Sequence, residues 1–448
     1  MHDEKRPDTG NVQAPEQKTD REIAGGPCSH ALGSATRRSL LRGLAGGGAA
    51  LGLMAGAGPA AAQSQQQPPG RNADVARQAQ SFHGLHQAGI VTPCPAAGLI
   101  ATFDVLATSR PELERLFRTL TERIAFLMGG GTPQELDPKF PPVDSGVLGP
   151  VIVPDNLTVT AAVGASLFDQ RFGLAAAKPV ELVPMTQFRN DALDPATCHG
   201  DLLLQFCANT PEANIHALRA IVKATPDLLA LHWTQDGFLP AATKTGTKET
   251  ARNLLGFKDG TANPDPADGT AMDNIVWVRR GGAEPAWTAG GTYQVVRIIR
   301  NFVERWDRTP LREQETIFGR SKVSGAPLGK QNEFDLPDYA GDSDGKVTPL
   351  SAHIRLANPR TRETAGSLIL RRPFNYSRGI TKSGQMDMGL LFICFQSSLQ
   401  AGFVAVQDRL NGEPLEEYIK PTGGGYFFVL PGVLDAGTYL GQGLIESA

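Results

Sequence analysis

Residues 99–128 read LIATFDVLATSRPELERLFRTLTERIAFLM, which is a strand pattern followed at once by a helix pattern. Residues 99–106 are mostly apolar and predict a buried strand. Residues 109–112 (Ser-Arg-Pro-Glu) then supply an N-cap, a proline in the first turn and a glutamate at the capping-box position. Apolar side chains recur every three or four residues until the glycines at 129–131, as one buried helix face requires: Leu113, Leu116, Phe117, Leu120, Ile124 and Leu127. The stretch therefore predicts a strand and a helix that pack together.

The elements that follow complete a six-element unit. Residues 157–163, 202–207 and 228–233 have the composition of strands, and residues 210–212 (Thr-Pro-Glu) open a second helix. That helix is expected to bury Ile215, Leu218, Ile221 and Val222. The order strand-helix-strand-strand-helix-strand is that of the ferredoxin-like, or split βαβ, arrangement, in which two helices cover an antiparallel sheet.

The second half of the chain repeats this order. Its predicted strands are residues 293–299, 368–370, 390–395 and 426–430, and its predicted helices are residues 309–318 and 398–410. The predicted fold class is therefore α+β, with two ferredoxin-like domains that have antiparallel sheets and are duplicated within one chain. We place the N-terminal domain at residues 78–240 and the C-terminal domain at residues 241–448.

Composition and charge exclude several classes of protein. Apolar residues make up 41% and charged residues 20% of the 448 positions, which is typical of a soluble folded chain and argues against an integral membrane protein. Lys and Arg number 43 against 46 Asp and Glu, so the net charge of -3 gives no electrostatic case for nucleic acid as a partner. Five cysteines are too few for a disulfide scaffold.

The N-terminus has the pattern of a targeting segment. Arg37 and Arg38 precede an uncharged, Gly- and Ala-rich run at 43–58, which ends in the small residues that a signal peptidase cuts. The run is shorter than the roughly 20 apolar residues of a membrane-spanning helix. Residues 1–62 therefore predict a twin-arginine signal peptide, recognised by the twin-arginine translocation machinery, and residues 63–77 a linker. The mature protein is expected to be periplasmic or secreted.

Most histidines lack the setting of a metal site. A site built from His83, His86 or Cys198 would need further ligands at a recognisable spacing, and the sequence offers none. His216 and His232 fall in the second helix and in the strand after it, where a structural histidine is the simpler interpretation.

Two segments have the composition of a reaction site. Residues 256–264 (GFKDGTANP) put Asp259 in a glycine-flanked turn, and residues 350–360 (LSAHIRLANPR) put His353 between polar and apolar neighbours. His353 follows Asp259 by 94 residues, and Arg371 follows His353 by 18. Each residue alone has a plainer interpretation: a turn aspartate that caps its own backbone, a core histidine and a solvated arginine.

Together, these segments resemble the dye-decolorizing peroxidase family, in particular its exported, deferrochelatase-like branch. Segments 86–90, 198–202, 325–329 and 425–428 are also similar to that family, so that the likeness covers most of residues 82–443. It implies two ferredoxin-like domains, with one haem b per chain bound in the second.

The resemblance also implies roles for individual residues. His353 would be the proximal ligand of the haem iron, and Glu413 its hydrogen-bonded carboxylate partner. Asp259 and Arg371 would be the distal catalytic pair. Arg371 would also contact the haem, together with Gly260, Thr261, Ala262, Asn358, Pro359 and Arg360. Where the family often has a polar side chain two residues beyond the distal arginine, this chain has Pro373.

The implied activity is that of a haem peroxidase whose partners are hydrogen peroxide and a small-molecule reductant such as a dye or a phenol. Asp259 would act as general base and then as general acid toward peroxide, and Arg371 would stabilise the negative charge that develops. The alternative is a periplasmic iron-supply protein, either a deferrochelatase that releases iron from haem or a haem carrier. The sequence leaves open whether the protein forms a homo-oligomer.

Arg37→Lys combined with Arg38→Lys is expected to leave the protein in the cytoplasm, still loaded with haem, because the paired arginines are the export determinant. Cell fractionation followed by immunoblotting measures this distribution. Arrival of the double variant in the periplasm in active form, through the general secretion route, would contradict the export assignment.

Overall fold

The structure is a computed structural model that describes residues 77–134, 137–240 and 250–447. The predicted signal peptide (1–62), and all of the predicted linker except its last residue, lie outside the described residues. No helix in the described part of the chain is long and apolar enough to cross a membrane.

The first half folds as predicted. Its sheet has the order β2-β3-β1-β4 with antiparallel pairing throughout, which is the ferredoxin-like order. Its main elements are β1 Ala97–Val105, α2 Arg110–Gly129, β2 Thr158–Gly164, β3 Leu202–Ala208, α3 Pro211–Ala224 and β4 Leu229–Phe238.

The second half repeats the strand order as β9-β5-β8-β7, with the short β6 also paired to β8. The two-domain, ferredoxin-like α+β fold class is thus confirmed. The elements are α4 Gly269–Ile275, β5 Thr292–Asn301, α5 Val303–Trp306, α6 Leu311–Phe318, α7 His353–Ala357, β6 Leu370–Arg371, β7 Phe374–Ile380, β8 Met386–Gln396, α8 Ala405–Leu410, β9 Ile419–Val429 and α9 Gln442–Glu446.

Two predicted elements of this half differ from the structure. The predicted strand 368–370 overlaps the two-residue strand β6 only at Leu370. The longer strand β7 that follows was not predicted. The predicted helix 398–410 is a π-helical turn at Gln400–Val404 that continues into α8. A π-helical turn widens a helix locally and commonly lies at a functional site.

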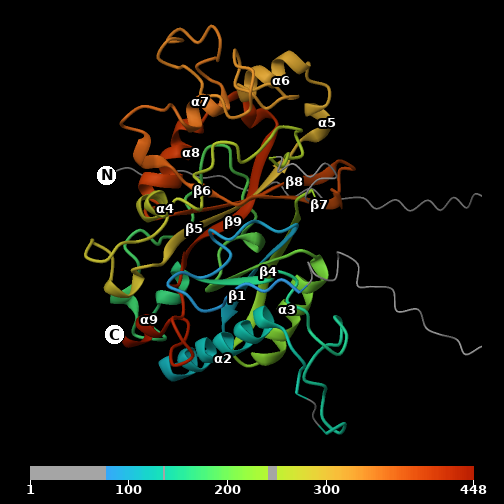
Figure 1. Ribbon diagram of the computed structural model, residues 1–448, viewed down its shortest axis with the longest axis vertical. Helices are drawn as coiled ribbons and strands as arrows, with labels where there is room; N and C mark the ends of the chain where they lie inside the picture. Colours follow the sequence, from blue (N-terminus) through green and yellow to red (C-terminus); the bar gives the residue numbers. More distant parts are fainter. Residues whose placement is uncertain (1–76, 135–136, 241–249, 448) are drawn as a thin grey trace, which may run out of the picture. The chain divides into compact units, whose positions relative to one another are not determined.

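The two halves share one sheet. Strand β9 pairs with β5 along its length and also with β2, where Val429 lies opposite Ala162. Strand β4 meets β7 where Phe238 lies opposite Asn375. The β5–β8 pairing then closes the strands into a ring. Figure 1 shows α2 and α3 together beside β1 and β4, and α6, α7 and α8 gathered near β6 and β8.

Helix α2 begins where the capping pattern predicted, but through a different contact. Ser109 has the extended backbone of an N-cap, yet its side chain makes no capping hydrogen bond. Instead, the Glu112 carboxylate accepts hydrogen bonds from the backbone N–H and the hydroxyl of Thr108, at 2.8 and 3.1 Å. The glutamate of the pattern therefore closes the first turn one residue further back than a capping box does.

Helix α3 buries a face that matches the predicted one only in part: Ile221 is buried and Leu218 packs against the core as expected. Ile215 and Val222 are 49% and 39% exposed, so the prediction that they point inward is wrong. The buried face carries Ala213, Asn214, His216, Ala217 and Ile221. Small residues on this face let the helix lie close to the sheet, and His216 is buried because it has a partner, as shown below.

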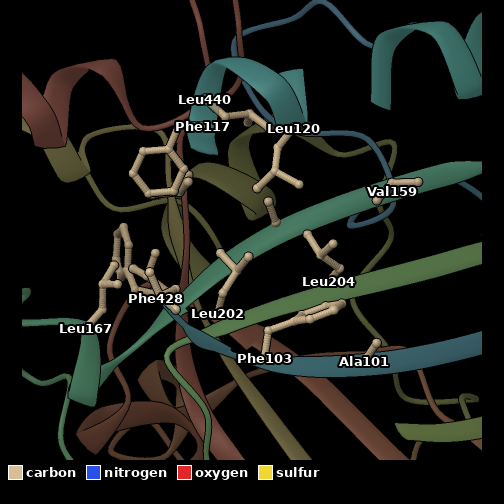
Figure 2. Packing of buried hydrophobic residues seen from close by; sticks show 14 of the residues in the cluster. Ala101, Phe103, Phe117, Leu120, Val159, Leu167, Leu202, Leu204, Phe428 and Leu440 are labelled. Carbon is tan, nitrogen blue, oxygen red and sulfur yellow. The ribbon is translucent and has the colours of Figure 1, made fainter. Parts of the chain in front are cut away.

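The main core lies between these helices and the sheet. Figure 2 shows Phe117 and Leu120 of α2 pointing toward Leu202 and Leu204 of β3, with Phe103 of β1 beside them. All five side chains are fully buried. Each large apolar side chain buried in this way contributes about 1.5 to 3 kcal/mol. The core fixes the first half as a rigid support for the second.

Buried His216 is held by Asp144, which lies in the segment between α2 and β2. Its Nε2 atom lies 2.7 Å from Asp144 Oδ2, and Asp144 Oδ1 accepts the backbone N–H of Gly146 at 2.7 Å. Burial raises the pKa of Asp144, but the hydrogen bonds from Gly146 and His216 outweigh burial and hold the pKa below its usual value.

Asp144→Asn is expected to destabilise the protein by about 1 to 2 kcal/mol at pH 7, because it weakens a hydrogen bond to a charged group. A depressed folded-state pKa stabilises the fold above the unfolded-state value of about 3.9, and this contribution is lost as the pH falls through the folded-state value. Thermal unfolding of both proteins at pH 7 and near pH 3 is the measurement. An equal difference at both pH values would contradict this assignment.

Candidate active site

One cavity of the second half collects nearly all of the residues that the sequence singled out. Its walls are otherwise largely apolar, with Ile354, Leu390 and Phe392 among the lining side chains. Pro359 is the exception among the predicted residues and does not line the cavity. The predicted residues that do are Asp259, Gly260, Thr261, Ala262, His353, Asn358, Arg360, Arg371 and Glu413.

The loop that carries Asp259 is anchored in a small aromatic core. Phe257 is buried and stacks on Phe318 with ring centroids 4.1 Å apart. Gly256 has a φ of 88°, and a Cβ atom there would lie 2.6 Å from Lys322, so the turn requires glycine. The backbone N–H of Asp259 donates to the carbonyl of Ala251 at 2.8 Å. The side chain of Asp259 is therefore displayed in the cavity from a fixed backbone.

Arg371 meets Asp259 from the sheet. It ends strand β6, where it pairs with Cys394 of β8. Its Nη1 atom donates to Asp259 Oδ1 at 2.5 Å, and the two side chains are 26% and 15% exposed. The neighbouring Arg372 points elsewhere, toward the backbone carbonyls of residues 92 and 93. The structure thus pairs Asp259 with the arginine chosen from its spacing.

A second contact joins the Asp259 loop to the Arg371 strand. The Asn263 side chain donates to the Arg371 carbonyl at 2.7 Å and accepts the Arg371 N–H at 2.8 Å. One amide side chain thus forms both hydrogen bonds of a strand partner. This contact holds the backbone of Arg371 against the loop independently of the ion pair.

His353 is the first residue of α7 and lies beside a buried carboxylate. Its Nδ1 atom is 2.8 Å from Glu413 Oε2, and the Glu413 side chain is only 4% exposed. Burial lowers the pKa of His353, but the charge and hydrogen bond of Glu413 raise it above its usual value. With Nδ1 directed at Glu413, no described residue is hydrogen-bonded to Nε2, which leaves this nitrogen for a ligand in the cavity.

Neighbouring residues fix the orientation of α7. Arg409 of α8 donates to the carbonyls of Leu356 and Ala357 at 3.1 Å each, so it caps the C-terminal end of this short helix. Phe318 packs edge-on against the His353 ring at 5.8 Å between centroids. The imidazole is therefore held by its carboxylate partner, by an aromatic contact and by its helix.

One edge of the cavity is cationic, because Arg320 lies there as well as the predicted Arg360. Arg320 is 6% exposed, and its Nη1 atom donates to the backbone carbonyls of Gly325 and Glu333. Tyr339 lines the same cavity with a buried hydroxyl that lacks a hydrogen-bond partner, and Arg360 lies nearby. Neither Arg320 nor Tyr339 belongs to a local pattern, so no sequence signal marks them. This edge suits an anionic group on a ligand.

Pro373 lines a second cavity, which also has Asp259, Gly260 and Arg371 in its wall. A proline side chain has no polar atom, so the departure from the family pattern removes one polar group beside the pair. Asn375, two residues further on, lines this cavity with a buried amide oxygen that has no partner.

The donor set does not suit a bare metal ion. Within residues 77–134, 137–240 and 250–447, no group of three or more His, Cys, Asp or Glu side chains could hold one. His86 stacks on Trp277 with ring centroids 3.7 Å apart, and His216 is bound to Asp144. A single imidazole with one free nitrogen in an apolar cavity, near a cationic edge, fits haem, whose four ring nitrogens already hold the iron and whose carboxylates are anionic.

Comparison with known proteins agrees with this geometry. Residues 87–239 match the family model described as Dyp-type peroxidase, N-terminal, and residues 250–434 match the C-terminal model. A deferrochelatase from Escherichia coli O157:H7 is 58% identical over 414 residues, which are 92% of this chain and 97% of that protein. One from Shigella flexneri is 57% identical over 415 residues, with the same shares covered.

Solved structures lead to the same family. A DyP-type peroxidase from Cellulomonas bogoriensis has a TM-score of 0.74 and 37% identity, with 83% of this chain and 99% of that chain covered. Ferric DtpA from Streptomyces lividans has a TM-score of 0.75 and 36% identity, with 83% and 98% covered. Both family models match in sequence order and together span most of the chain, so this protein belongs to the Dyp-type peroxidase family, whose cofactor is haem.

Proposed function

We propose that this protein is a haem-dependent peroxidase that reduces hydrogen peroxide and oxidises dyes, phenols or similar reductants. One observation carries the proposal: the Asp259–Arg371 pair and the His353–Glu413 pair line the same cavity. A protein that only stored haem would need the histidine, but it would have no use for a carboxylate and a guanidinium placed together.

The chain's residues divide the work of holding the cofactor. His353 would bind the iron through Nε2, while Glu413 keeps Nδ1 protonated and increases the electron donation of the ring. Thr261, Ala262 and Asn358 would contact the porphyrin, and Arg320 and Arg360 suit its carboxylates. When bound, haem supplies the redox-active iron at which peroxide is reduced.

Asp259 and Arg371 act on the peroxide itself. The Asp259 carboxylate takes a proton from one oxygen of hydrogen peroxide and returns it to the other oxygen, which then leaves as water. Arg371 stabilises the negative charge that builds up as the O–O bond breaks. Overall, hydrogen peroxide takes two electrons from the reductant and two protons, and two molecules of water form.

The second candidate function is the release of iron from haem. It is favoured by the names of the curated relatives, which are called deferrochelatase and are 57% and 58% identical to this chain. Both functions would use the cavity that His353 lines. The export assignment supports either function, because both a peroxidase and an iron-supply protein would meet their substrates outside the cytoplasm.

Two measurements on the purified, haem-loaded protein separate the functions. The first is steady-state turnover with hydrogen peroxide and a dye, and the second is recovery of intact, iron-free porphyrin. We expect sustained dye oxidation at a rate set by peroxide. Recovery of iron-free porphyrin in stoichiometric amounts, without dye turnover, would overturn the peroxidase proposal in favour of iron release.

Asp259→Asn keeps the size of the side chain and removes the base, so the rate of the first peroxide step should fall by roughly 10² to 10⁴. Arg371→Leu removes charge stabilisation and should slow the same step by about 10² to 10³. Stopped-flow absorbance after mixing with peroxide measures both rates. A wild-type rate for Asp259→Asn beside a slow Arg371→Leu would make the arginine the essential group and withdraw the acid–base role of Asp259.

His353→Ala should abolish stable haem binding, because no other described side chain of the cavity offers an imidazole. Glu413→Gln should weaken haem affinity by about 10- to 100-fold, the usual effect of removing a ligand's hydrogen-bonded partner. Haem titration of the apoprotein is the measurement. His232→Ala is the matched control and should bind haem normally, because His232 lies outside the cavity and pairs with Asp104. Normal haem content in His353→Ala would refute the ligand assignment.

A further inference from the structure

Glu333 contacts the Asp259 loop on both sides of the catalytic carboxylate. It lies in the long loop between α6 and α7, and its side chain is 10% exposed. Its Oε2 atom accepts a hydrogen bond from Lys258 Nζ at 2.5 Å, and its Oε1 atom accepts one from the Thr261 hydroxyl at 2.8 Å. Lys258 immediately precedes Asp259, and Thr261 follows it by two positions. One carboxylate thus holds both flanks of the residue.

A third residue of the same segment, Thr250, acts on the charge state of Glu333. Burial raises the pKa of Glu333, but the hydrogen bonds from Lys258, Thr250 and Thr261 bring it below its usual value. Glu333 therefore binds Lys258 and Thr261 as an anion, and hydrogen bonds to an ionised acceptor are about twice as strong as neutral ones.

The position of Glu333 is itself fixed by the cationic edge of the cavity. Its backbone carbonyl accepts Arg320 Nη1 at 3.0 Å. Gly325, at a φ of 77°, lies against the ion pair: a Cβ atom there would be 2.7 Å from Lys258 and 3.4 Å from Glu333. The absence of a side chain at Gly325 gives the Lys258–Glu333 pair its space. Glu333 is therefore held by Arg320, a residue of the cavity wall, as well as by the loop that it contacts.

Besides the packing of Phe257 and the hydrogen bond from Asp259 to Ala251, two side chains tie the Asp259 loop to other elements. Asn263 fixes its far end to the backbone of Arg371, and Glu333 fixes the residues on each side of Asp259. The two anchors come from two different elements that both follow the loop in sequence, the α6–α7 loop and strand β6. Without Glu333, the residues on each side of Asp259 would lose these hydrogen bonds, so the direction of the carboxylate would be less tightly set.

We propose that Glu333 is a positioning residue for the peroxide step: by holding Lys258 and Thr261, it sets the place of the Asp259 carboxylate relative to Arg371. This inference rests on the function proposed for Asp259. A general base must lie within hydrogen-bond reach of the proton that it takes. A displacement of about 1 Å commonly slows a reaction by about 10²-fold.

The test begins with Glu333→Gln, which keeps the size of the side chain and one acceptor but removes the charge. In the haem-loaded protein the rate of the peroxide step should fall by about 10- to 100-fold, with haem content unchanged. In the haem-free protein, hydrogen exchange of the backbone amides in 250–263 should become faster. Asp201→Asn is the matched control: its carboxylate is also part-buried, at 12%, and binds Arg171, but it lies outside the cavity. It should change neither readout.

The double variant Asp259→Asn with Glu333→Gln shows whether the effect passes through Asp259. Residues that act as a unit are strongly non-additive, so the double variant should react no more slowly than Asp259→Asn alone. An additive loss, or a wild-type rate for Glu333→Gln, would overturn the proposal. A wild-type rate for Asp259→Asn would instead locate the failure in the function proposed for Asp259, and the positioning role would fall with it.

Thr250→Val provides a milder variant in case Glu333→Gln does not fold. It removes the hydroxyl of Thr250 that lowers the pKa of Glu333 and leaves the ion pair with Lys258 in place. It should slow the peroxide step by a smaller factor, about 2- to 5-fold, in the same non-additive manner with Asp259→Asn. An unchanged rate together with unchanged exchange in 250–263 would overturn the proposal.

Discussion

Strand β9 is the constraint on which the site depends, because it is hydrogen-bonded on both sides. It pairs with β5 within the second half and with β2 of the first half, so that the register of one strand fixes both domains. Glu413 lies a few residues before this strand, just ahead of a single helical turn. The carboxylate that holds His353 is therefore placed by a strand that the well-packed first half supports.

The three residues proposed to hold haem and act on peroxide lie on elements of different kinds. Arg371 belongs to a strand paired with β8, and His353 begins a helix capped by Arg409. Asp259 alone lies on a loop, and a loop has higher intrinsic mobility than the elements around it. The hydrogen bonds of Glu333 to Lys258 and Thr261, and the ion pair of Asp259 with Arg371, hold this loop in place of the regular backbone hydrogen bonds of a strand or helix. A reaction that needs a base within hydrogen-bond reach requires such anchoring.

The order of the main elements could be predicted from local patterns, and the main site residues followed from the resemblance to a known family, but contacts across the fold could not be predicted. Strand and helix periodicity are local, so the two βαββαβ units were predicted from sequence alone. The prediction that Ile215 points inward from α3 was wrong. The buried face of this helix uses small residues and a paired histidine, which apolar periodicity does not detect. Glu333 and Lys258 are 75 residues apart, and no spacing rule connects them.

The ion pair between Asp259 and Arg371 has a further consequence for what the cavity accepts. Removing one partner of a buried pair leaves an uncompensated charge, which is strongly unfavourable. A ligand that separates the two side chains must therefore offer a hydrogen-bond donor to the carboxylate and an acceptor to the guanidinium. Hydrogen peroxide offers both on adjacent oxygen atoms, whereas an anion would satisfy only Arg371 and a cation only Asp259. The ion pair, in which the charges of Asp259 and Arg371 cancel, thus favours a small neutral molecule that can both donate and accept a hydrogen bond, which is the property that a peroxidase requires of its oxidant.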